Sequence, residues 1–350
     1  MALPIASALL ASIIGLAGMA ATGSLSWQPW KHLSAVFDLV GPRSDGKLVA
    51  AAGGQLFLVT RDGTITPFAD GSGGYHAASG PESYIALSPG LHVSAAGCDF
   101  ARDDLFVLRP SNPLGITRVD PSGQATNFVD ITGVDTLNGI VFDTVGRFDH
   151  RLLVTGPHNQ HSTILAIDCK GAIVPITDAA PSLEGGLAVA PSGFGTHAGE
   201  LIAPDEYSGA MLAISATGQS SVIVASGIPH GGDIGVESAA FVPPGFGAGG
   251  AAYVADRATA NNPHPGTDTI LQLMAADLTQ AGVREGDLLV AAEGGGVTID
   301  VRCAATCTST TIVPTGTSAH IEGHLLMVVD QPRPTPTPLP AVTQLGQTGA

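Results

Sequence analysis

Glutamates that stand directly before apolar runs are the residues of this sequence best suited to chemistry. Glu184 opens the stretch EGGLAVAP, and comparable stretches open with Glu82 (ESYIALSP), Glu237 (ESAAFVPP) and Glu322 (EGHLLMVV). Asn138 stands one place into LNGIVFDT, where it offers a neutral oxygen. Carboxylates that lie close together repel one another unless they are protonated or neutralised. A divalent cation would neutralise them, and calcium suits irregular sets of oxygen ligands.

These stretches belong to a repeat that organises the chain. Their starts lie about 37 to 55 residues apart when Leu137 and a less secure match at Glu285 are included, which is the spacing of four-stranded propeller blades. Strand-like runs and turn signals follow each start, as in ELIAPDEYSG, AMLAISATG and SVIVAS after Glu184. The 46 glycines and 25 prolines also favour an all-β fold with many turns.

The repeat predicts a six-bladed β-propeller closed by a blade made from both termini. The runs between Lys47 and Asp70 match the second, third and fourth strands of a blade but have no first strand before them. The first strand at Glu322 has no second, third or fourth strand after it. We therefore expect it to complete the blade near the N-terminus, and this ring closure would remove the exposed sheet edges. If the Glu285 stretch is only a loop, the alternative is five blades with an insertion.

The propeller geometry would bring the strand starts together. Innermost strands line the central channel, and their starts lie at one face, the top. We therefore predict that a set of side chains at the top of the channel binds the metal: Glu82, Asn138, Glu184, Glu237 and Glu322. The alternative is that these carboxylates are solvated or accept hydrogen bonds from turn amides.

Loops at the same face supply candidate catalytic residues. His158 and His161 lie in PHNQHS and Arg257 lies in DRATANNPHPGTD, both between second and third strands, and His230 precedes a first strand. A histidine beside a metal site can act as general base, because it exchanges its proton near neutral pH. Arg257 can hold a substrate anion or a developing oxyanion. For each histidine alone, an ordinary polar loop residue is the alternative.

The two ends of the chain differ from the repeat. Residues 1–26 contain a long apolar run without charged side chains, and we expect a signal peptide or an uncleaved N-terminal anchor. Residues 32–330 form the predicted propeller, and residues 331–350 form a Pro/Thr-rich disordered tail. The protein is therefore expected to be secreted or at the cell surface, with membrane contact only through the anchor.

The net charge restricts the binding partners, and the cysteines indicate disulfides. The formal net charge of −16 leaves no basic surface for phosphates, which excludes a nucleic-acid binder. Four cysteines in an exported chain favour disulfides. The spacing of Cys303 and Cys307 suits a hairpin bridge, and Cys98 and Cys169 map to the bottom face of neighbouring blades, where a bridge between them can form.

The chain resembles the six-bladed calcium-dependent propellers of the SMP-30/gluconolactonase/LRE-like group. The resemblance rests on PES at Glu82, LNGIVF at Asn138 and LEGGLAV at Glu184, and it spans about Lys47 to Asp330. It implies a divalent metal held at innermost-strand starts and hydrolysis of lactones or phosphoesters. The Asn-Gly start typical of the group is clear only at Asn138, and glutamate replaces the others. Related NHL-like propellers share the blade pattern, and many of them bind ligands without catalysing a reaction.

Two functions follow from these observations. The first is an exported metal-dependent hydrolase of lactone or ester type, with calcium as the expected metal and the site at the top of the channel. The second is a non-catalytic cell-surface propeller that binds a glycan or a protein and in which any metal is structural. In both cases we expect a monomer whose top face takes a small-molecule or glycan ligand.

Overall fold

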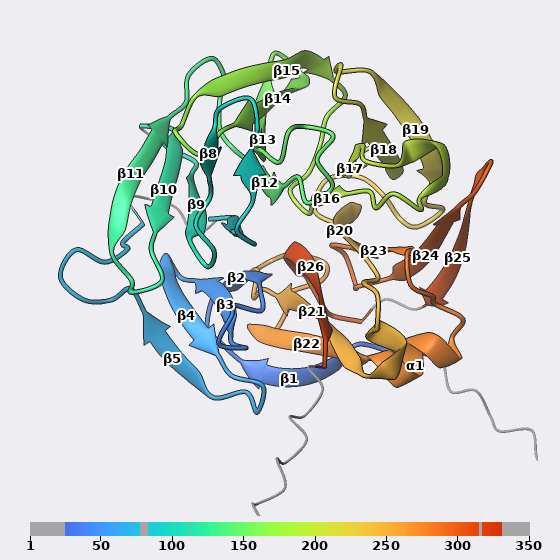
Figure 1. The fold of residues 1–350 in the computed structure, drawn as a ribbon. Coiled ribbons are helices and arrows are strands. Elements are labelled where there is room, and N and C mark those ends of the chain that lie inside the picture. Colours follow the sequence, from blue (N-terminus) through green and yellow to red (C-terminus); the bar gives the residue numbers. More distant parts are fainter. Residues whose placement is uncertain (1–24, 78–82, 112, 315–316, 331–350) are drawn as a thin grey trace, which may run out of the picture.

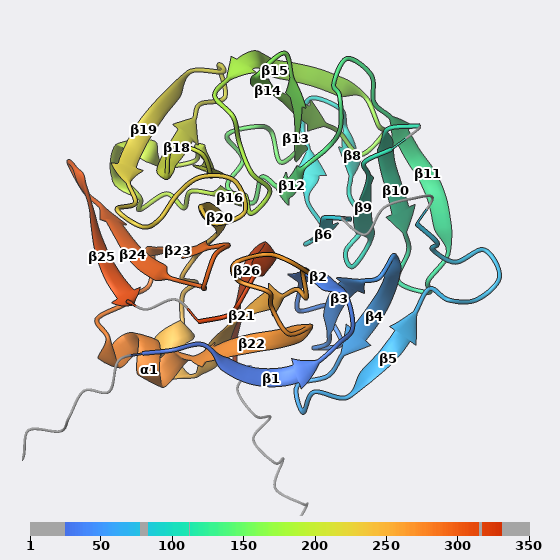
Figure 2. The ribbon, with the colours of Figure 1, turned by 180° about the vertical axis from the view of Figure 1, so that it is seen from behind.

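Six four-stranded antiparallel sheets surround a central axis in the computed structural model (Figures 1 and 2). The structure describes residues 25–77, 83–111, 113–314 and 317–330. The six-bladed propeller is thereby confirmed, and the five-bladed alternative is wrong. Residues 1–24 of the predicted leader and the tail from 331 lie outside the described residues.

The first four blades follow the chain, each from its innermost to its outermost strand. The first consists of β2 (Val36–Val40), β3 (Leu48–Ala52), β4 (Gln55–Val59) and β5 (Ile65–Phe68). The second consists of β6 (Ile85–Leu87), β9 (Leu105–Arg109), β10 (Gly115–Val119) and β11 (Ala125–Asp130), with the small hairpin β7 (His92–Val93) and β8 (Cys98–Asp99) inserted after β6. The third consists of β12 (Gly139–Phe142), β13 (Leu152–His158), β14 (His161–Ile167) and β15 (Ile173–Ala180), and the fourth of β16 (Ala188–Val189), β17 (Leu201–Asp205), β18 (Ala210–Ile214) and β19 (Ser220–Ala225). The turn Gly195–His197 (η1) separates β16 from β17.

The last two blades are interleaved in sequence. The fifth blade begins with β20 (Val236–Phe241), but after the turn Phe246–Ala248 (η2) the chain crosses to the sixth blade for β21 (Gly250–Asp256) and β22 (Thr269–Met274). After α1 (Ala275–Gln280) it returns to the fifth blade for β23 (Leu288–Ala292), β24 (Thr298–Cys303) and β25 (Cys307–Val313). Finally β26 (Ile321–Val329) pairs with β21 as the innermost strand of the sixth blade, and β1 (Gln28–His32) pairs with β22 as its outermost strand.

The closing blade is therefore built from both termini, as expected, but from other strands than those predicted. The runs between Lys47 and Asp70 have their own innermost strand, β2, in which the buried Asp38 interrupts the apolar pattern. The Glu285 stretch is a second strand, β23, and the Glu285 carboxylate accepts a hydrogen bond of 2.7 Å from the Gly245 amide. Apolar runs of this length fit any buried strand position, so the sequence alone did not reveal the crossing.

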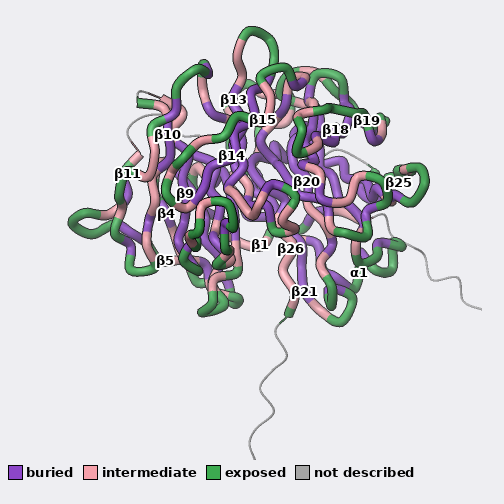
Figure 3. The backbone as a smooth tube through the Cα atoms, turned by 45° about the horizontal axis from the view of Figure 1, so that its top comes forward, coloured by how far each residue is buried: buried purple, intermediate pink, exposed green. Residues whose placement is uncertain are grey.

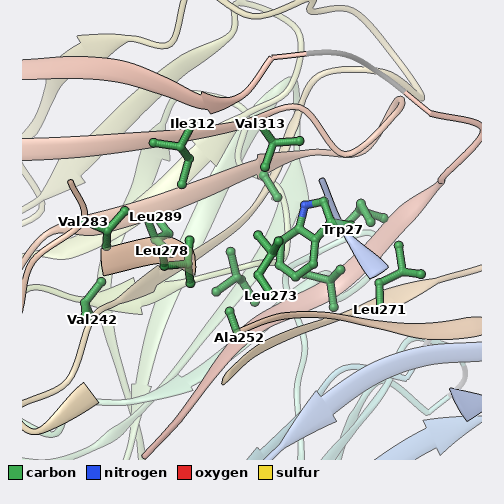
Figure 4. Close-up of a cluster of buried hydrophobic side chains, with 14 of the residues drawn as sticks. Trp27, Val242, Ala252, Leu271, Leu273, Leu278, Val283, Leu289, Ile312 and Val313 are labelled. Carbon is green, nitrogen blue, oxygen red and sulfur yellow. The ribbon is translucent and has the colours of Figure 1, made fainter. Parts of the chain in front are cut away.

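The N-terminal segment around Trp27 packs against the fifth and sixth blades. Trp27 is buried among side chains of the fifth and sixth blades (Figure 4). Its indole Nε1 lies 2.9 Å from Thr298 Oγ1 and 3.1 Å from the Gly296 carbonyl oxygen, and it donates to both. The propeller thus includes Trp27 and β1, ahead of the boundary at residue 32 that the sequence predicted.

Burial falls from the inner strands to the outer ones (Figure 3). Every residue of β3, β18 and β23 is buried, whereas the outermost strands β5, β11 and β19 carry several exposed side chains. Neighbouring blades cover both faces of the inner strands, which is why these strands read as continuous apolar runs.

Both predicted disulfides are present. Cys98 in β8 is bonded to Cys169 after β14, and Cys303 at the end of β24 is bonded to Cys307 at the start of β25. Disulfides of this kind persist in oxidising compartments. Among the described residues there is no helix with the length and apolar character that a membrane crossing requires.

Candidate site at the top of the channel

The innermost strands bring the predicted glutamates to one end of the channel. Glu237 and Glu322 are the second residues of β20 and β26, and Glu184 precedes β16. The Gly186 amide donates to the Glu237 carbonyl at 3.1 Å, and the charges of Glu184 and Glu322, after burial, raise the pKa of Glu237. Glu82, the remaining predicted carboxylate, lies outside the described residues.

Burial makes ionisation of this cluster costly. It raises the pKa of Glu237 well above its usual range, and the neighbouring Glu184, Glu322 and Glu293 raise it further. The pKa of Glu184 rises to about 7, first through burial and then through Glu293 and Glu322. Such a cluster takes up either protons or a cation at neutral pH.

The two glycines after Glu184 allow close packing at the axis. A Cβ atom on Gly185 would lie 2.0 Å from the Tyr84 ring carbon Cζ, and one on Gly186 would lie 2.3 Å from the Glu237 carbonyl oxygen. The Gly186 amide donates to that same carbonyl at 3.1 Å, which joins the start of the fourth blade to β20. The EGG motif therefore places Glu184 beside Tyr84 and Glu237.

Asn138 is held by two hydrogen bonds just before β12. Its Nδ2 donates to the Leu183 carbonyl at 2.7 Å, and its Oδ1 accepts from Thr155 Oγ1 at 3.1 Å. These contacts fix which end of the amide is the oxygen, and a carbonyl oxygen keeps a second lone pair for another ligand.

A chain of charged groups runs from Arg257 through Glu322 and His320 to Glu293. Arg257 Nη1 lies 3.1 Å from Glu322 Oε1, and His320 Nε2 lies 3.2 Å from the same oxygen. His320 Nε2 also lies 3.0 Å from Glu293 Oε1. Burial acts to lower the pKa of His320, but hydrogen bonds and charges from Glu293 and Glu322 raise it to about 9. His320 is therefore an imidazolium at neutral pH.

Further acidic side chains adjoin this chain. Glu206 follows β17, Asp233 lies in the loop before β20, and Glu293 follows β23. One carboxylate oxygen from each lies within 4.8 Å of the others. Burial raises the pKa of Glu206 to about 8, and the adjacent Glu293 adds to this effect.

The predicted catalytic histidines occupy the rim. His158 Nδ1 lies 3.4 Å from Asp135 Oδ1, and His158 stands opposite the exposed His161 across the β13–β14 turn. The exposed His230 makes a hydrogen bond of 2.9 Å to the Tyr207 carbonyl. In the described part of the chain, the structure joins Arg257 to the glutamates but records no direct contact of these three histidines with them.

Sequence reasoning gave no role to Tyr84, Glu206, Glu293 or His320. A signal for two of them was present, because Glu206 and Glu293 both directly follow the second strand of their blade. Assigning the Glu285 stretch to a first strand concealed this position of Glu293. The role of Tyr84 depends on side-chain contact across the channel, for which the repeat contains no signal.

Comparison with known proteins yields structural likenesses only. No family model and no curated protein sequence matches the chain. Solved structures that it resembles include virginiamycin B lyase from Staphylococcus aureus, at 14% identity, with 84% of this chain and 90% of that chain covered and a TM-score of 0.41. They also include a gluconolactonase-like protein (13% identity, 71% and 91% covered, TM-score 0.35) and a 6-phosphogluconolactonase-like protein from Bacteroides uniformis (14% identity, 81% and 68% covered, TM-score 0.38). The propeller assignment rests on the six sheets themselves, and these activities are those of the other proteins.

Proposed function

We propose that the protein is an exported, metal-dependent hydrolase of lactone or ester type, with its site at the top of the channel. The supporting observation is the charge balance there. Burial, and then neighbouring glutamates, raise the pKa values of Glu184, Glu206, Glu237 and Glu322, and Glu293 is one of the neighbours in each case. The cations that pair directly with Glu293 or Glu322 are Arg257 and His320. A divalent cation would offset the excess negative charge.

The donor set fits a hard cation such as calcium. Glu184, Glu237 and the Asn138 oxygen would hold it, with Glu82 and Glu322 as the further predicted ligands, and all of these donors are oxygens. Tyr84 donates to Oε1 of Glu237, which leaves the second oxygen of that carboxylate for a cation. Glu322 already pairs with Arg257 and His320, so we expect it to contribute least.

The side chains of the site would divide the work of ester cleavage. When bound, the metal would polarise the carbonyl of the substrate. Arg257 and His320 place two positive charges beside Glu322, where they can stabilise a developing oxyanion or hold a product carboxylate. His158, His161 and His230 remain candidate bases at the rim, since a neutral imidazole can accept the proton of an attacking water.

Export and the family resemblance support the same proposal. The two disulfides suit an oxidising compartment, and the apolar run within residues 1–26 suits a leader or anchor. The motifs at Glu82, Asn138 and Glu184 favour the SMP-30/gluconolactonase group within the propellers.

Calcium titration and a substrate panel test the proposal. Glu184→Gln and Glu237→Gln should each weaken calcium binding at the channel by about tenfold or more, which is about 1.4 kcal/mol. Glu285→Gln, on the opposite face, should leave it unchanged. The calcium-loaded protein should hydrolyse members of a lactone and ester panel, and both variants should lose this turnover. Absence of calcium binding at the channel would refute the metal site.

A specific observation favours the binding propeller as a second candidate. The Tyr207 side chain is 63% exposed in the β17–β18 loop, beside His230, and an exposed aromatic ring of this kind can stack on a sugar. Calcium binding without turnover on any substrate, together with retention on a glycan array that Tyr207→Ala abolishes, would support this function instead.

A further inference from the structure

Two groups of metal-ligand type share Glu293, and their chemistry differs. The first contains Glu293, His320 and Glu322. His320 Nε2 lies within hydrogen-bonding distance of both carboxylates, and a proton on this nitrogen pairs it with them and leaves it no lone pair for a metal. Arg257 completes the neutralisation of Glu322. The first group is therefore an ion-pair network.

The second group contains only carboxylates. Glu206, Asp233 and Glu293 each place an oxygen within 4.8 Å of the others. Glu206 is 7% exposed, and its Oε1 is buried without a hydrogen-bond partner among the described residues. A buried carboxylate oxygen without a partner is costly. Asp233 is exposed, which leaves the group open to ions and water from the solvent.

Backbone contacts hold the three loops of this group together. The Gly231 amide donates to the Glu206 carbonyl at 3.0 Å, and the Glu293 amide donates to the Gly235 carbonyl at 2.8 Å. A Cβ atom on Gly235 would lie 2.2 Å from the Glu206 carbonyl oxygen, so glycine is needed for this approach. The loop that carries Asp233 is thus fixed on one side to the fourth blade and on the other to the fifth.

We propose that Glu206, Asp233 and Glu293 bind a second divalent cation of calcium type, off the channel axis between the fourth and fifth blades. Three carboxylates and solvent water form an all-oxygen set suited to calcium. The cation supplies the partner that the buried Glu206 oxygen lacks and fastens the β19–β20 loop to the top face. This site does not depend on the proposed hydrolase activity.

Calorimetric titration of the full chain with calcium tests the site. We expect two ions per chain in the unchanged protein. Asp233→Asn and Glu206→Gln should each lose the off-axis ion, whereas Glu237→Gln should keep that ion and bind the channel ion about tenfold or more weakly. Asp178→Asn, an exposed carboxylate on the outermost strand β15, is the matched control and should keep both ions. Circular dichroism checks that each variant is folded, and the exposed Asp233 allows a reading even if Glu206→Gln perturbs its loop.

The variants separate this site from the channel site. An ion that is lost in Asp233→Asn and kept in Glu237→Gln supports the off-axis site even if the channel binds nothing. Calcium binding that Asp233→Asn and Glu206→Gln leave unchanged in number and affinity overturns the off-axis site while leaving the channel proposal intact. A protein that binds no calcium overturns both.

Discussion

The Tyr84 hydroxyl donates a hydrogen bond of 2.8 Å to Glu237 Oε1, which joins the second blade to the fifth across the top of the channel. Both side chains are buried, and the Tyr84 ring packs edge-on against Phe37 with centroids 4.8 Å apart. The contact thus combines a buried polar bond with aromatic packing at the point where the blades meet.

Tyr84→Phe should destabilise the metal-free protein by about 1–3 kcal/mol, because it removes a donor from a buried carboxyl group while keeping the ring. The loss should be smaller with saturating calcium, since a cation at Glu237 replaces the donor. Chemical denaturation with and without calcium measures both values. Tyr75→Phe removes a bond of 3.2 Å to Ser83 Oγ and serves as control, with a loss that calcium does not change. Equal losses for Tyr84→Phe in both conditions would contradict a cation at Glu237.

The metal-free protein should become less stable as pH rises. The pKa values of Glu184, Glu206 and His320 rise to about 7, about 8 and about 9, from ordinary values of 4.5, 4.5 and 6.5. Each group binds its proton more tightly in the folded state, so its stabilising contribution is full below the ordinary value and is lost as pH rises through the folded value.

Thermal denaturation in the presence of a chelator measures this dependence. We expect the melting temperature to fall by about 5 °C or more between about pH 5 and about pH 9. Calcium should restore most of the loss at the upper end, where the carboxylates are ionised. A melting temperature that is constant or rises over this range would show that the cluster does not take up protons on folding.

Arg257→Met should cost about 2–4 kcal/mol in unfolding free energy, because it breaks a largely buried ion pair with Glu322. The guanidinium also lies 5.5 Å from the centroid of the Phe37 ring, so part of the loss is a cation–π contact. Arg61→Met breaks the exposed pair with Asp330 and should cost less than about 0.5 kcal/mol. Similar losses for the two variants would show that the Arg257 pair is not a buried one.

Asp38→Asn should cost about 3–5 kcal/mol, since it removes the carboxylate that pairs with the buried His324. His324 Nδ1 lies 2.9 Å from Asp38 Oδ1, and its Nε2 donates to the Ile140 carbonyl at 2.9 Å, while Asp38 also accepts from the Ile85 amide at 2.7 Å. The pair therefore ties four innermost strands together. Chemical denaturation measures the loss of unfolding free energy. His92→Gln, which breaks the exposed pair with Asp99, is the control and should cost little. Equal losses of unfolding free energy for the two variants would refute the structural role of the buried pair.

The sequence by itself determined the class of fold and most of the metal-ligand candidates. Period, turn signals and apolar runs are local properties, so they predicted six blades and placed Glu184, Glu237 and Glu322 at innermost-strand starts. The assignment of faces predicted the Cys98–Cys169 bridge, and the short spacing of Cys303 and Cys307 predicted the other. These predictions succeeded because each blade repeats one local pattern.

Only the tertiary structure decided which strands share a blade and which side chains meet. The crossing from β20 to β21 and back to β23 joins strands that are distant in sequence, and their apolar patterns are alike. This crossing places Glu293, directly after β23, at the site. Closure of the ring brings the Tyr84 hydroxyl to Glu237 across the channel. Contacts of this kind depend on how separate blades close into a ring, which local sequence does not specify.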